Sequence, residues 1–213
     1  MKAFFSTTAR VLEGQLDAAI ASSADAAKVV GRHGGEVRFF MAIAAGEQVD
    51  STLFSVEYDS PEAMAQAFDA MNTDPEIHRL RTEARGTAQT SASMAIELAT
   101  GHTPTPGRGS IVEAHASQVK PGRMEEFLGD AADVCAFVEA NGALNARLLQ
   151  LTYAGISSGL TTMIWEHENM AAQARVGAAW FTEAGLALQA KSRYAADPSS
   201  VTGASMLYNE IPL

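Results

Sequence analysis

The sequence predicts an α+β protein in which one βαββαβ unit occurs twice. Sliding the chain against itself by 108 residues aligns identical residues: Val11 with Val119, Gly14 with Gly122, Asp25 with Asp133, Val30 with Val138, Gly34 with Gly142 and Leu80 with Leu188. The order of strand, turn and helix signals repeats along with these identities. Near the end the register slips by four, so that Ala92-Ser93-Met94 meets Ala204-Ser205-Met206. We therefore expect a first repeat over 1–98, a Pro/Gly/Thr-rich linker over 99–109 and a second repeat over 110–213.

Each half opens with an extended stretch, at 3–11 and 110–119. Apolar and polar side chains alternate along the second one, Val112, Ala114 and Ala116 against Glu113, His115 and Ser117. That period of two is typical of a strand with two unlike faces. Apolar residues then recur every three or four positions, which predicts an amphipathic helix that ends at Gly34 or Gly142. Cys135 lies on the apolar stripe of the second helix, so we expect it to be buried and inert.

The rest of each half predicts a hairpin, a second helical region and a last strand. The hairpin strands are expected at 37–45 and 52–58 and at 144–153 and 160–167, with turns at 45–48 and 154–159. Ser60-Pro61-Glu62 starts the helical region of the first half, because serine caps a helix and proline suits its first position. The counterpart starts at Asn169. The last strands are expected at 91–98 and 204–211.

This order defines the ferredoxin-like unit, an antiparallel sheet with both helices on one face. The bare face would forfeit roughly 25 cal/mol for each Å² of apolar surface left in water, so a second sheet must cover it. The doubled unit, with a capped helix followed by Asp74-Pro75-Glu76-Ile77-His78-Arg79-Leu80, resembles the dimeric α/β barrel superfamily. Its branches include antibiotic-biosynthesis-type monooxygenases and NIPSNAP-like proteins. The resemblance implies a barrel of two sheets, sometimes with a ligand cavity, and no single activity.

Composition and missing motifs exclude several classes of function. The 213 residues carry a formal charge of -10 and a single cysteine, which disfavours nucleic-acid binding, an internal disulfide and a thiolate zinc site. Neither an apolar run of about 20 residues nor a signal-peptide pattern occurs, so we expect no membrane span and a cytoplasmic location. Nucleotide-binding, Gly-x-Ser-x-Gly and metal-ligand spacings are also missing, so no metal and no cofactor are expected.

His115 is the most informative candidate for chemistry. If helices cover the face of Val112, Ala114 and Ala116, then Glu113 and His115 point into the barrel. A histidine beside a carboxylate in an apolar cavity could act as a base, with Glu113 as its orienter. The alternative is a histidine whose hydrogen bonds are purely structural.

Four further residues are candidate ligand contacts. His167 and Trp165 end the third strand, which we take to run parallel to the first. His167 would then lie on the order of 10 Å beyond His115, too far to share a metal, and could simply cap the next helix. Arg147 and Tyr153 could bind an anionic or phenolic group, although a surface salt bridge is the simpler role for Arg147. Core filling is the first interpretation of Trp165.

These features predict a protein that handles a small apolar or aromatic compound. The enzymatic form would be a cofactor-independent monooxygenase or an isomerase; whether the chain is an enzyme stays open. The alternative is a non-enzymatic binding or assembly module with a fully packed barrel, and a cavity of roughly 300 Å³ or more would separate the two. Haem held by His115 or His167 is a more distant third. The chain could also pair as a homodimer through exposed strand edges.

Overall fold

A computed structural model describes residues 1–46, 51–83 and 88–213, which form two compact units. Unit 1 comprises Met1–Ile96, Thr152–Ile156 and Asn209–Leu213. Unit 2 comprises Glu97–Leu151 and Ser157–Tyr208. None of the helices in these described ranges is long and apolar enough to cross a membrane.

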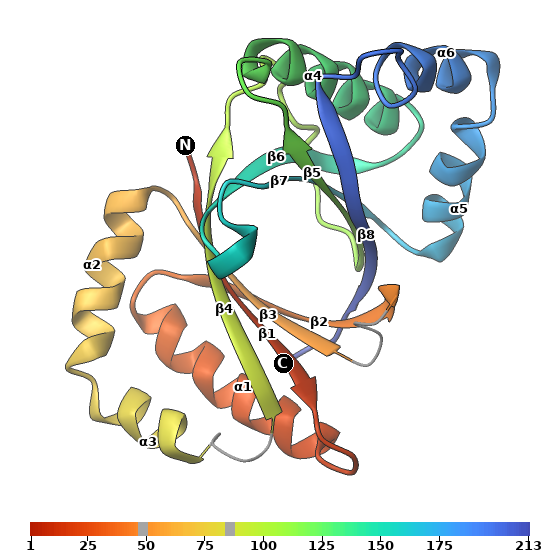
Figure 1. The fold of residues 1–213 in the computed structure, drawn as a ribbon. Helices are drawn as coiled ribbons and strands as arrows, with labels where there is room; N and C mark the ends of the chain where they lie inside the picture. The colour runs from red at the N-terminus through yellow and green to blue at the C-terminus, as the bar shows by residue number, and fades with distance from the viewer. Residues whose placement is uncertain (47–50, 84–87) are drawn as a thin grey trace. The chain divides into compact units, whose positions relative to one another are not determined.

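Unit 1 is built around a four-stranded antiparallel sheet. In chain order its elements are β1 (Ala3–Val11), α1 (Leu16–Arg32), β2 (Glu36–Ala44), β3 (Ser51–Tyr58), α2 (Pro61–Asn72), α3 (Pro75–Glu83) and β4 (Ala88–Leu98). The strands lie in the order β4-β1-β3-β2, and the helices cover one face of the sheet (Figure 1). Of the turn expected at 45–48, Glu47 and Gln48 lie outside the described residues.

Unit 2 repeats this arrangement. Its elements are β5 (Ile111–Val119), α4 (Met124–Ala140), β6 (Leu144–Tyr153), the short 3-10 helix η2 (Gly155–Ser157), β7 (Thr161–His167), α5 (Met170–Ala179), α6 (Glu183–Lys191) and β8 (Ser200–Glu210). The strand order is β8-β5-β7-β6, with α4, α5 and α6 on one face (Figure 1).

The bounds of the elements follow the offset seen in the sequence. β5, α4 and α6 begin and end 108 residues after β1, α1 and α3, whereas β8 lies 112 residues after β4. Gly34 and Gly142 follow the first helix of each unit with φ of 82° and 101°, which suits glycine. The predicted fold class, two ferredoxin-like βαββαβ units in one α+β chain, is confirmed.

The helix starts also form as the sequence indicates. The Ser60 hydroxyl accepts a hydrogen bond from the Ala63 amide at 3.1 Å, and Pro61 occupies the first helical position of α2. Asn169 does the same for α5, accepting from the Ala172 amide at 3.0 Å. These caps place α2 and α5 at equivalent positions in the two units.

The expected direction of the third strand is wrong. β5 and β7 run antiparallel, with Ile111 opposite His167 and Glu113 opposite Trp165. In this fold the first strand is parallel to the second, and the third strand lies between them. The end of β7 therefore lies beside the start of β5, which brings His167 close to Glu113.

The expected orientation of β5 is also wrong. Trp165, the cross-strand neighbour of Glu113, packs against Val138 of α4 and Val176 of α5 in a core cluster. Glu113 itself is hydrogen-bonded to Gln173 of α5. Helices therefore cover the face of Glu113 and His115, and Val112, Ala114 and Ala116 lie on the opposite face.

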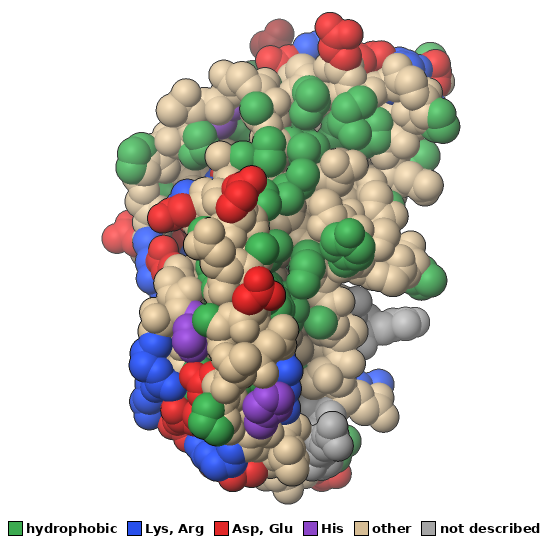
Figure 2. All heavy atoms as spheres, turned by 90° about the vertical axis from the view of Figure 1, so that its left-hand side faces the viewer, with side chains coloured by type: hydrophobic (Ala, Val, Ile, Leu, Met, Phe, Trp, Pro, Cys, Tyr) green, Lys and Arg blue, Asp and Glu red, His purple; other side chains and the backbone are tan. Residues whose placement is uncertain are grey.

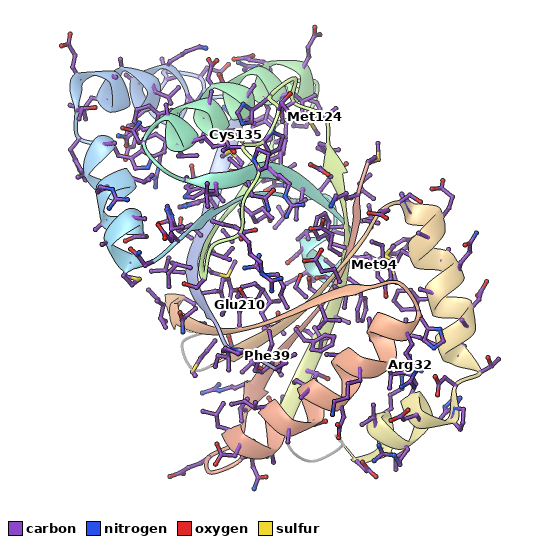
Figure 3. All side chains as sticks on the ribbon, turned by 180° about the vertical axis from the view of Figure 1, so that it is seen from behind. Arg32, Phe39, Met94, Met124, Cys135 and Glu210 are labelled. Atoms are coloured by element: carbon purple, nitrogen blue, oxygen red, sulfur yellow. The ribbon has the colours of Figure 1, made fainter. Side chains whose placement is uncertain are left out.

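The prediction that Cys135 is buried is confirmed. Cys135 is fully buried on α4, among the side chains between that helix and the sheet (Figure 3). Burial raises the pKa of its thiol to about 12, with a further contribution from Glu139. Its reactive thiolate is therefore scarce at neutral pH.

The surface over α3 in unit 1 has acidic, basic and histidine side chains interspersed (Figure 2). Arg32 bonds to Glu76 at 2.7 Å, and the His33 ring lies 3.1 Å from the Asp74 carboxylate. An exposed pair such as Arg32 with Glu76 stabilises a fold by only about 0–1 kcal/mol. We read this surface as a solvated face.

Candidate functional site

A buried carboxylate, Glu113 on β5, is the centre of a polar cluster inside unit 2. The indole Nε1–H of Trp165 and the Nε2–H of His167 both donate to its Oε2, the latter at 3.0 Å. Gln173 of α5 donates from its side-chain amide to Oε1 at 2.9 Å. Three donors from two elements thus converge on one side chain, which keeps 17% of its surface accessible.

Glu113 is ionised in this setting. Burial alone opposes the charge, but the hydrogen bonds from His167, Gln173 and Trp165 outweigh it and lower the pKa to about 2. Charge-assisted hydrogen bonds of this kind are roughly twice as strong as neutral ones. The cluster therefore contains a fixed negative charge at neutral pH.

His115, two residues further along β5, lies against the same tryptophan. Its ring stacks on Trp165 with a centroid separation of 4.5 Å and an interplanar angle of 20°. Nδ1 lies 2.9 Å from the hydroxyl oxygen of Ser205 on β8, and Nε2 is buried with no hydrogen-bond partner among the described residues. Burial lowers the pKa of His115; Glu113 opposes this, and Arg193 and His167 add to it. His115 is therefore neutral near pH 7.

His167 is fully buried at the end of β7. Because a carboxylate can only accept, the bond to Glu113 places a proton on His167 Nε2 and leaves Nδ1 without a partner among the described residues. The pairing expected from the sequence was different. Glu113 was assigned to orient His115, yet its described hydrogen-bond partners are Trp165, His167 and Gln173.

The other two candidates lie outside this cluster. Arg147 of β6 is opposite Ile164, which is opposite Ala114, so Arg147 lies on the sheet face away from the helices. It is only 8% exposed, so it is not the surface residue that the sequence suggested. Tyr153 is 74% exposed and belongs to unit 1.

Unit 1 has core-packed aromatic or apolar residues at four of the positions that form this cluster in unit 2. Register and helix caps pair Phe5 with Glu113, Val56 with Trp165, Tyr58 with His167 and Met64 with Gln173. All four unit 1 residues belong to or pack against one hydrophobic core. The same fold is therefore built without buried charge, and the polar cluster is not a requirement of the architecture.

Two cluster members, Gln173 and Ser205, were missed by the sequence analysis. Gln173 is the fourth residue after the Asn169 cap, on the side of α5 that turns to the sheet. Ser205 belongs to the segment where the repeat slips by four. The sequence contains the position of Gln173 after its cap and the shifted segment of Ser205. Glutamine and serine are common on surfaces, however, and only the register of the sheet brings these two residues to the cluster.

The linker glycine Gly109 packs directly on His167. A Cβ added to Gly109 would lie 2.2 Å from the His167 carbonyl oxygen, which is rigid backbone. The Gly109 amide also donates to Glu166 at 2.9 Å. This close approach fixes the strand end that carries His167.

Gly109→Ala is therefore expected to destabilise the protein by about 2 kcal/mol, the range typical of overpacking. Gly129→Ala is the matched control, because its added Cβ meets nothing within 4 Å and alanine favours the helix. Urea unfolding followed by circular dichroism measures both variants. Equal stability of the two would contradict the close contact.

The histidines do not fit an axial haem ligand. His167 is fully buried with Nε2 held by Glu113, and His115 Nε2 is buried, so neither nitrogen is open to an axial iron in this structure. In the described part of the chain, no group of three or more His, Cys, Asp or Glu side chains is placed to hold a metal ion.

Comparison with known proteins finds likeness in structure. No family model matches the sequence, and no curated protein matches it significantly. A "putative monooxygenase" from Lactobacillus acidophilus NCFM has a TM-score of 0.64 at 9% identity, covering 100% of this chain and 99% of that one. A second, from Fusobacterium nucleatum, has a TM-score of 0.61 at 8% identity and covers 99% and 93%. An anthrone oxidase-like protein has a TM-score of 0.60 at 12% identity and covers 99% and 92%.

These likenesses establish the fold alone, because every identity is far below 25%. The chain has the fold of the dimeric α/β barrel superfamily, as the resemblance in its sequence indicated. Fold and site together define an α+β protein of two ferredoxin-like units, with a largely buried Glu-His-Trp cluster in its second unit.

Proposed function

We propose that unit 2 binds a small aromatic or apolar compound with a hydroxyl group at the cluster of Glu113, His115 and Trp165. The observation that carries this proposal is the contrast between the units, since unit 1 has Phe5 and Val56 at the positions of Glu113 and Trp165. A buried charge often stabilises a fold less than a packed apolar side chain at the same position. Its presence in unit 2 therefore favours a role beyond stability. The similar solved structures described as putative monooxygenases and as anthrone oxidase-like support an oxygenase role.

In the enzymatic form, His115 is the base and no cofactor is needed. A neutral imidazole takes the proton of a bound phenol at Nε2, with Nδ1–H donating to Ser205. The negative charge of Glu113 stabilises the imidazolium through space, and Trp165 holds the ring plane. The resulting phenolate reacts with dioxygen: one oxygen atom enters the ring to give a quinone, and the other leaves as water. An isomerase would use the same proton transfer without dioxygen.

Titration with 1-naphthol tests the binding step. Because His115 Nε2 is enclosed, a ligand must displace the side chains around it, and we expect quenching of tryptophan fluorescence with saturation. His115→Ala should weaken this binding at least tenfold and abolish any quinone formation while the protein stays folded. His78→Ala, at an exposed site in unit 1, is the control. Unchanged naphthol binding in His115→Ala would reject the proposal and favour a packed, non-enzymatic assembly module.

A further inference from the structure

Among the described hydrogen bonds of Glu113, Trp165 and His115, one joins the cluster to an exposed nucleophilic side chain. That side chain is Ser205 on β8. Ser205 is exposed, whereas its partner His115 is largely buried. Its hydroxyl oxygen lies 2.9 Å from His115 Nδ1. A serine within hydrogen-bond distance of a histidine is the arrangement that activates serine as a nucleophile.

The buried network orients His115 toward this serine. The bond from Trp165 to Glu113 fixes the indole, and the indole stacks on the imidazole at 4.5 Å. The Glu113 carboxylate is itself held by His167 and Gln173. His115 is thereby preorganised with Nδ1 at the hydroxyl, so little ordering is needed when the hydroxyl reacts.

We propose that Ser205 is a nucleophile activated by His115 and that it is acylated by aryl esters. This role goes beyond the proposed binding of phenols and does not depend on it. It uses the His115 tautomer with the proton on Nε2, the opposite of the one used for a phenol at Nε2.

The step is an ordinary acyl transfer. The hydroxyl proton of Ser205 passes to His115 Nδ1 as the oxygen attacks the ester carbonyl, and the tetrahedral adduct then expels the aryl oxide. The aryl oxide takes the proton from His115 and leaves as a phenol. Water later hydrolyses the acyl-serine, with His115 again as the base.

An aryl ester is the expected class because the base lacks a directly bonded carboxylate. The described partners of Glu113 do not include His115, so Glu113 acts on the imidazolium only through space. Loss of the bonded carboxylate in a serine-histidine-aspartate triad lowers turnover by about 10⁴. A phenol that leaves readily compensates for this weaker base, whereas alkyl esters would not react.

Incubation with p-nitrophenyl acetate tests the proposal. We expect release of p-nitrophenol about 100-fold faster than with Ser205→Ala, and addition of one acetyl group that peptide mass mapping places on Ser205. His115→Ala should slow acetylation to the same extent. Ser93→Ala, at the equivalent position of β4, is the matched control and should behave as the wild type.

Acetylation confined to lysines or the N-terminus, or an unchanged rate in Ser205→Ala, would overturn the proposal. The naphthol titration uses the wild type and His115→Ala and follows fluorescence. The acetylation assay is decided by where the acetyl group sits. Either proposal can therefore fail while the other stands.

Discussion

Replacing Glu113 with alanine is expected to lower the free energy of unfolding by about 3–5 kcal/mol. The change removes the acceptor of three donors at once, those of Trp165, His167 and Gln173, of which the first two are buried. The His167 side chain is fully buried, so water does not replace Glu113 as the acceptor of its Nε2–H. Urea unfolding at pH 7, followed by circular dichroism, measures the loss.

The matched control exchanges the cluster for the residues of unit 1. The triple variant E113F/H167Y/Q173M has the residue types that unit 1 has at the equivalent positions, those of Phe5, Tyr58 and Met64. It removes the Glu113 acceptor together with the His167 and Gln173 donors. It should regain part of the lost stability. The Trp165 indole then lacks its acceptor, and the new tyrosine hydroxyl stays unpaired, as the buried Tyr58 hydroxyl is among the described residues of unit 1. A loss below about 1 kcal/mol in Glu113→Ala would show that the cluster is not tightly bonded.

The sequence predicts the fold because the information is local and occurs twice. Apolar periodicity, the cap at Ser60 and the glycines at 34 and 142 each specify a nearby piece of backbone. The offset of 108 residues then allows the predicted bounds of each helix and strand to be compared with those of its counterpart in the other half. Elements supported by two independent segments are predicted well, down to the shift of four residues before β8.

The site is predicted only in part, because its geometry depends on pairing between distant strands. His115, Glu113, Trp165 and His167 are all named from residue type and position, yet the hydrogen-bonded pair is Glu113 with His167. Alternation along β5 shows that the strand has two faces but not which one the helices cover. A carboxylate and a histidine on the covered face run against the usual pattern, so the hydrophobic rule selects the wrong face.

That reversal bears on function. A buried, charged network on the helix side replaces a set of side chains that unit 1 makes apolar. Selection for stability alone favours the apolar set, since replacing buried polar groups by packed apolar ones is often neutral or stabilising. The polar set persists in unit 2 together with an imidazole nitrogen that no described residue satisfies. These two features are what the proposed ligand accounts for.

The second large effect is on the pH dependence of stability. Hydrogen bonds lower the pKa of Glu113 to about 2 in the folded protein, against 4.5 for an unperturbed glutamate. A lowered folded-state pKa means that the unfolded chain binds the proton first as pH falls, so the stabilisation is complete above about pH 4.5 and is lost toward pH 2. A shift of this size corresponds to about 3 kcal/mol.

Urea unfolding of the wild type and of E113F/H167Y/Q173M between pH 4.5 and pH 2, below the range in which an unfolded histidine titrates, measures this contribution. Other carboxylates with lowered pKa values, such as Asp74 and Asp197, titrate in both proteins and cancel in the difference. The wild type should therefore lose about 3 kcal/mol more than the triple variant below pH 4.5. Parallel stability curves would mean that Glu113 has an ordinary pKa and that its hydrogen bonds do not stabilise the ionised carboxylate.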